Sequence, residues 1–177
     1  GYPYKELCGA GVAWNVIRVL YENYDMDKRE AEDLLDFVAM ATVCDVMSLT
    51  GENRILVKEG LKRIRHTKNI GLQALMQACN VQPENISAYH FGYVLGPCVN
   101  ATGRLDTARH ALRLFETGQE TEAEEIARDL VDLNQERKEL TLQGVEMAKK
   151  LCEEGGYEND PVLVLFLPDV HESIAGL

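Results

Sequence analysis

One aspartate in an apolar stretch has the setting best suited to metal or acid chemistry. Asp45 follows the run Ala41 to Cys44 and precedes Val46 and Met47. A carboxylate that is ionised and unpaired in a low-dielectric setting costs several kcal/mol, so it is usually paired with a cation, hydrogen-bonded or bound to a metal. Taken alone, Asp45 is better explained as a helix cap or a half-exposed side chain.

A second candidate lies between Gly96 and Arg104, where glycine, an amide side chain and a guanidinium occur close together. We expect this stretch to be a loop. Backbone N–H groups near Gly103, the fork of Arg104 and the start of a helix predicted over Asp106 to Phe115 could together hold a phosphate. A structural loop whose arginine pairs with a carboxylate fits the same residues.

Charge is segregated along the chain, whose net charge is −11. This balance opposes indiscriminate nucleic-acid binding by a basic surface, but it leaves room for a local basic site. Gln119 to Glu154 holds 11 acidic and 5 basic residues, whereas Lys58 to Lys68 has five basic residues and only Glu59 against them. The basic stretch fits either a solvated helix face or a phosphate contact.

Cysteine usage and hydropathy bear on the compartment. The five cysteines are odd in number and widely spaced, with no CxxC pair, which favours buried thiols in a reducing compartment over a zinc cluster. No apolar run approaches the roughly 18 to 20 residues of a membrane span. We therefore expect a soluble, cytoplasmic protein without a membrane partner.

In the segments that carry these candidate residues, apolar side chains recur mostly at helical spacing. Asp27 is a predicted cap for a short helix that ends near Leu35. Asp36 to Leu49 fits a helix buried nearly all round, although Val43 and Val46 keep a strand possible. A turn over Thr50 to Arg54 is expected to lead into an amphipathic helix.

The C-terminal third combines a long helix with a strand-like run. Gln119 to Glu154 predicts one helix of about 36 residues, roughly 54 Å long, of the kind that connects domains or forms a coiled coil. Gly155 and Gly156 are expected to end it. Val162 to Phe166 resembles a short buried strand, which cannot cover both of its faces alone, so we expect it to open a truncated α/β domain.

Five separated blocks of the chain share one further property. They are Leu7 to Ala13, Asp36 to Val46, Gly51 to Arg54, Gly96 to Arg104 and His171 to Gly176. Together, and in this order, they resemble RecJ-type single-stranded-DNA-specific exonucleases of the DHH phosphoesterase superfamily. The resemblance covers essentially the whole chain.

The resemblance implies a role for several residues. Asp45 matches a ligand of a centre of two Mn²⁺ or Mg²⁺ ions, and hard divalent cations do prefer carboxylate oxygens. Asn100, Gly103 and Arg104 match a loop on the nucleic-acid path, and His171 matches the start of a substrate-handling domain. The family's Asp-His-His signature does not occur in this chain, and Cys98 stands where many relatives have arginine.

The resemblance also implies a division of the chain into three parts. Residues 1–118 match the C-terminal helical part of a DHH domain, 119–154 a connecting helix, and 155–177 the start of a truncated DHH-associated domain, so the expected class is mainly α. We expect an internal fragment of a 5′–3′ single-stranded-DNA exonuclease of repair and recombination. No catalytic set is complete in it, so we expect no activity, no bound metal and self-association through exposed surfaces.

Two alternatives from other classes remain. Another DHH phosphoesterase, acting on oligonucleotides or cyclic dinucleotides, would share the Asp45 block. A non-catalytic helical interaction module would explain the acidic long helix and the missing ligands.

Overall fold

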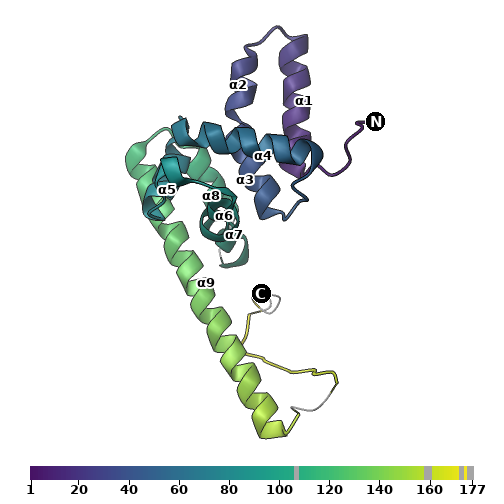
Figure 1. Cartoon of the computed structure of the whole chain (residues 1–177). Helices are drawn as coiled ribbons and strands as arrows, with labels where there is room; N and C mark the ends of the chain where they lie inside the picture. Colours follow the sequence, from purple (N-terminus) through teal and green to yellow (C-terminus); the bar gives the residue numbers. More distant parts are fainter. Residues whose placement is uncertain (106–107, 158–160, 172–173, 175–177) are drawn as a thin grey trace.

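The chain forms a bundle of helices from which one long helix extends, as a computed structural model shows (Figure 1). The structure describes residues 1–105, 108–157, 161–171 and 174, with the side chains of 104 and 105 outside that description. The expected mainly α class is confirmed, and no strand occurs among the described residues. The elements in chain order are α1 Gly9–Asn23, α2 Lys28–Asp33, α3 Leu35–Cys44, α4 Gly51–Arg63, η1 Ile64–His66, α5 Ile70–Ala78, η2 Pro83–Asn85, α6 Ala88–His90, η3 Phe91–Leu95, α7 Gly96–Leu105, α8 Ala108–Glu116 and α9 Glu120–Gly155.

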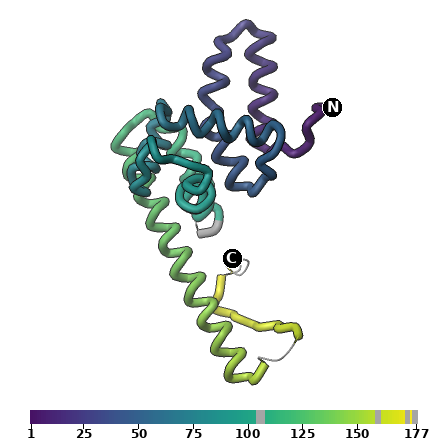
Figure 2. Tube along the Cα trace, in the orientation of Figure 1, coloured from purple at the N-terminus to yellow at the C-terminus, as the bar shows by residue number. Residues whose placement is uncertain are grey.

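The first two helices form a hairpin that projects from the bundle (Figure 2). The indole N–H of Trp14 in α1 donates a hydrogen bond of 2.7 Å to the carbonyl of Ala31 in α2, which holds the pair together. Asp27 caps α2, as predicted, because its carboxylate accepts a hydrogen bond from the backbone N–H of Arg29.

Two hydrophobic clusters hold the bundle. The smaller one joins α1, α3 and α4 through Trp14, Leu35, Val38 and Leu56. The larger one lies among α3 to α9, and its fully buried side chains include Ile64, Leu72, Leu75, Phe91, Leu95, Leu114 and Leu130. Burying a large apolar side chain stabilises a fold by about 1.5–3 kcal/mol, so the larger cluster is the main support of the bundle.

A glycine permits the close crossing of α3 and α4. A Cβ atom built at Gly60 would lie 2.3 Å from the Cβ of Ala39 and 2.5 Å from the carbonyl oxygen of Leu35. Both distances are well inside van der Waals contact, so any larger residue at position 60 would push the two helices apart. This crossing fixes the direction of α3, which ends beside Asp45.

The long helix is present nearly as predicted, from Glu120 to Gly155, and Gly156 ends it with a positive φ of 69°. Its first turns bury Ala123, Ile126 and Leu130 against α5, α7 and α8. The distal half extends beyond the bundle and is mostly exposed (Figure 1). The helix is therefore half core element and half projecting arm.

The predicted strand over Val162 to Phe166 is not formed: residues 161–167 have no regular secondary structure, and Val164 is 92% exposed. A strand needs a neighbouring strand to bond its backbone groups, and none lies within the described residues. The chain instead returns along α9, where Val170 lies against Gly144. None of the described helices is both long enough and apolar enough to cross a membrane.

Candidate metal ligand and nucleic-acid interface

Asp45 is exposed and is the C-cap residue of α3, so it is a helix cap, as expected of it taken alone, and not a buried carboxylate. The predicted helix over Asp36 to Leu49 is a helix and not a strand, but it ends at Cys44 because Val46 takes a positive φ of 55°. The backbone N–H of Asp45 bonds to the carbonyl of Ala41, and its carboxylate makes no hydrogen bond or ion pair within the described part of the chain. An exposed carboxylate without such partners is free to bind a ligand from outside.

The connection after Asp45 is fixed by one buried amide. The side-chain nitrogen of Asn53 donates hydrogen bonds to the carbonyls of Ser48, at 3.1 Å, and Glu6, at 2.7 Å. The predicted turn over Thr50 to Arg54 is in fact the first turn of α4, which starts at Gly51 with a φ of 48°. Asn53 therefore ties the N-terminal segment and the Asp45 connection to the same helix.

The buried carboxylate of this region is Asp36, which the sequence reasoning missed. It is 3% exposed, and its Oδ1 atom has no hydrogen-bond partner. Burial raises the pKa of this carboxyl, an effect that the Thr67 hydroxyl and the charge of Arg63 partly oppose. Its position among Leu34, Leu35 and Phe37 is the signal that could have identified it.

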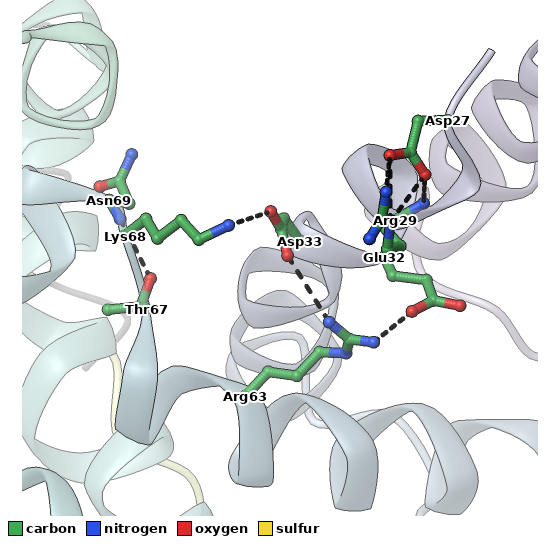
Figure 3. A network of polar contacts seen from close by, with 8 residues as sticks. All are labelled: Asp27, Arg29, Glu32, Asp33, Arg63, Thr67, Lys68 and Asn69. Carbon is green, nitrogen blue, oxygen red and sulfur yellow. Dashed lines mark hydrogen bonds and ion pairs between the residues drawn. The ribbon is translucent and has the colours of Figure 1, made fainter.

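A cavity of about 620 Å³ lies beside Asp36, between α3 and the end of α4. At its rim Arg63 pairs with Glu32 and with Asp33, and Lys68 pairs with Asp33 at 3.4 Å (Figure 3). These side chains are at least one-third exposed, so each pair contributes about 0–1 kcal/mol. The basic stretch is thus partly neutralised, which favours the solvated-face interpretation over a phosphate contact.

The predicted loop from Gly96 to Arg104 is wrong, because these residues form α7. The preceding turn, η3, is a π-helix in which the N–H of Gly96 bonds to the carbonyl of Phe91. Pro97 has no N–H to give to a helical hydrogen bond, and its ring crowds the preceding turn. The wider π-helical turn lets the helix continue through the proline where a loop was expected.

Close packing places α7 beside the end of α3. A Cβ atom at Gly96 would lie 2.4 Å from the Sγ atom of Cys44, and the Cys44 thiol lies 3.4 Å from the carbonyl oxygen of Phe91. Asn100 follows Gly96 by one turn and Gly103 follows by two, so all three share one side of the helix. Asn100 and Gly103 are exposed, and the Cys44–Gly96 contact places their helix beside the end of α3 that Asp45 follows.

The other two predicted site residues are not brought to this region by any described contact. The backbone of Arg104 belongs to α7, while its side chain lies outside the described residues. His171 follows Val170, which packs on Gly144. On α9, Gly144 is ten residues, or about 15 Å, beyond Asn134, whose amide lies 3.6 Å from the Cys98 thiol of α7. His171 thus lies beside the distal half of α9.

The carboxylate of Asp45 fits one position in the coordination sphere of a hard divalent cation. Within the described residues, no group of three or more His, Cys, Asp or Glu side chains is placed to hold a metal ion. The described residues therefore form no complete metal centre, and Asp45 is a single candidate ligand.

Solved structures of an exonuclease share this fold. RecJ from Thermus thermophilus in complex with Mn²⁺ matches with a TM-score of 0.82 and 32% identity, over 97% of this chain and 25% of that one. An exonuclease RecJ bound to manganese matches with a TM-score of 0.83 and 33% identity, over 98% of this chain and 43% of that one. The fold therefore defines the class: a helical segment that matches part of the RecJ structures over nearly its whole length.

Curated RecJ sequences match this chain, as the RecJ structures do. The single-stranded-DNA-specific exonuclease RecJ of Haemophilus influenzae is 34% identical over 189 aligned residues, which span 100% of this chain and 33% of the relative. RecJ of Bacillus subtilis is 31% identical over 163 residues, 92% of this chain and 20% of the relative. No protein-family model matches the chain. Sequence and fold together show that the chain is RecJ-type, and it spans about a third or less of the length of these relatives.

Proposed function

We propose that this chain is the helical part of a single-stranded-DNA-specific 5′–3′ exonuclease in which Asp45 is one metal ligand and α7 borders the nucleic-acid path. The observation that carries the proposal is the exposed Asp45 carboxylate at the end of α3, held against α7 by the Cys44–Gly96 contact. The RecJ relatives, which are single-stranded-DNA-specific exonucleases, support it.

The residues of this chain have positioning and binding roles in the proposal. Asp45 offers a carboxylate to one of two Mn²⁺ or Mg²⁺ ions, which supply an activated water and charge stabilisation for phosphodiester hydrolysis when they are bound. The amide of Asn100 and the backbone at Gly103 contact the strand as it passes α7. Arg104 and His171 are proposed to contact the nucleic acid at positions further along the path.

The larger organisation is proposed on the same support. Residues 1–118 belong to a DHH domain, 119–154 to its connecting helix and 155–177 to the next domain. The exposed distal half of α9 is then the arm that connects the two. The remaining metal ligands come from segments outside these residues, so the 177-residue chain alone has no nuclease activity.

An exchange experiment tests this proposal. The matched segment of Thermus thermophilus RecJ is replaced by this chain, and the hybrid is assayed with Mn²⁺ on labelled single-stranded and double-stranded DNA of one sequence. We expect degradation of the single strand only, and no degradation by the 177-residue chain alone.

Circular dichroism of the hybrid provides the folding control. A hybrid that unfolds cooperatively and binds Mn²⁺ but leaves single-stranded DNA intact would contradict the proposal. Degradation of single-stranded DNA by the 177-residue chain alone would contradict the assignment of the other ligands to other segments.

A further inference from the structure

Two tyrosines form an exposed stacked pair on the helix that leads into α7. The rings of Tyr89 and Tyr93 have centroids 5.1 Å apart and planes inclined by 24°. The two residues are 63% and 73% exposed. Aromatic rings are usually placed where their apolar faces are covered, so a stacked pair this open to solvent presents a flat apolar surface to a partner.

The pair is in line with the proposed nucleic-acid interface. Residues 88–105 form one continuous helical rod made of α6, η3 and α7. Tyr89 and Tyr93 stack on each other near the start of this rod, and Asn100 is exposed further along it, in α7. Between them the rod passes the point where Gly96 meets Cys44, the neighbour of Asp45.

The chemistry of the two tyrosine rings indicates which kind of ligand they bind. Every nucleobase has a π face, and stacking on aromatic side chains is the sequence-tolerant way in which proteins hold single strands. In a duplex the bases are already stacked on one another and cannot cover these rings. With a net charge of −11, the chain has little general attraction for a polyanion, so a contact through the bases supplies what the backbone contacts lack.

We propose that Tyr89 and Tyr93 are a stacking platform for the bases of single-stranded nucleic acid, which directs the strand along α7 toward Asn100 and Asp45. The direction of the strand rests on the proposed function. The platform itself rests on the geometry of the two rings.

Binding of the 177-residue chain to two fluorescent probes tests the platform. One probe is a single-stranded oligothymidine, and the other is an abasic oligonucleotide of the same length and charge. Fluorescence anisotropy should show tighter binding of the oligothymidine, and this preference should change little with salt because stacking releases no counterions.

Substitutions then locate the contact. The double variant Tyr89→Ala/Tyr93→Ala should lose roughly fivefold or more of its affinity for oligothymidine, while its affinity for the abasic probe stays the same. The double variant Tyr89→Phe/Tyr93→Phe keeps both rings and should retain the preference. Tyr24→Ala is the matched control, because Tyr24 is 74% exposed at the far end of α1 and is expected to have no effect.

Three results would overturn the platform: no binding of oligothymidine by the wild-type chain, equal affinity for the two probes, or a preference that survives the double alanine change. Its failure is distinguishable from failure of the proposed exonuclease. A base preference that depends on the tyrosines, combined with an inactive hybrid, would contradict only the proposed exonuclease function. An active hybrid, combined with a base preference that survives the alanine changes, would contradict only the proposed stacking platform.

Discussion

Replacing Asp36 by asparagine should stabilise the fold at neutral pH. The carboxylate is 3% exposed and leaves Oδ1 without a partner, and a buried polar group without a hydrogen bond costs about 1–3 kcal/mol, more when it is charged. Asparagine has nearly the same shape and no charge. Because the ion pairs of Arg63 with Glu32 and Asp33 are untouched by the change, we expect a net gain of about 1 kcal/mol.

The pH dependence of this gain follows from the raised pKa of Asp36. A carboxyl whose pKa is higher in the folded chain than its ordinary 3.8 favours folding most when it is protonated, below that ordinary value. This contribution is lost as the pH rises through the folded-state pKa. The advantage of the Asp36→Asn variant should therefore be small near pH 4 and largest at neutral pH.

Thermal and urea unfolding of the two proteins across this pH range measures the effect. For a chain of this size, about 1 kcal/mol corresponds to a rise in Tm of roughly 2–4 °C. Asp33→Asn is the matched control: Asp33 is half-exposed and pairs with Arg63 and Lys68, so its loss should destabilise slightly. A variant Asp36→Asn that is less stable than wild type at neutral pH, or whose difference is the same at every pH, would refute the reasoning.

Three further changes test other parts of the structure. Gly60→Ala should cost about 1–3 kcal/mol in urea unfolding because the α3–α4 crossing has no space for a methyl group, whereas Gly103→Ala, which meets nothing within 4 Å, should be neutral or stabilising. Asn53→Ala should cost about 1–3 kcal/mol, since two carbonyls lose their donor; an unchanged urea midpoint would contradict this. Burial raises the pKa of Cys44 to about 11, so mass spectrometry should find it unalkylated by iodoacetamide at pH 8 and reactive only near that pKa, and rapid labelling at pH 8 would contradict the burial.

The sequence predicted the helices whose signals are local. The long helix was predicted within one residue at each end, because its polar and apolar spacing persists over ten turns. The Asp27 cap was also predicted, since the capping bond joins residues only two apart. Periodicity and capping are properties of a short window, so they can be read without knowledge of the fold.

The errors arose where a distant contact decides the local structure. Gly96 and Pro97 are typical of a loop, and only the π-turn together with the close contact of Gly96 with Cys44 makes them part of a helix. Val162 to Phe166 has strand composition, but a strand forms only beside another strand. Neither outcome can be derived from the residues within a window.

The candidate site stays a prediction, and what the structure adds to it is the packing of distant segments. The sequence located Asp45 and Asn100, and the structure brings their helices together through packing that no local pattern encodes. It singled out Asp45 for its apolar neighbours, whereas the buried carboxylate is Asp36 at the other end of α3. A helix that is apolar on nearly every side does not reveal which of its two acidic residues faces the interior.

The most direct test of the central claim is the Asp45→Asn change within the Thermus thermophilus RecJ hybrid. The measurement is Mn²⁺-dependent hydrolysis of single-stranded DNA, together with the Mn²⁺ affinity of the hybrid. Asp25→Asn, an exposed change in the turn between α1 and α2, serves as the control. We predict that Asp45→Asn abolishes hydrolysis and weakens Mn²⁺ binding while leaving the unfolding midpoint unchanged. Full hydrolysis by the Asp45→Asn hybrid would contradict the assignment of Asp45 as a metal ligand.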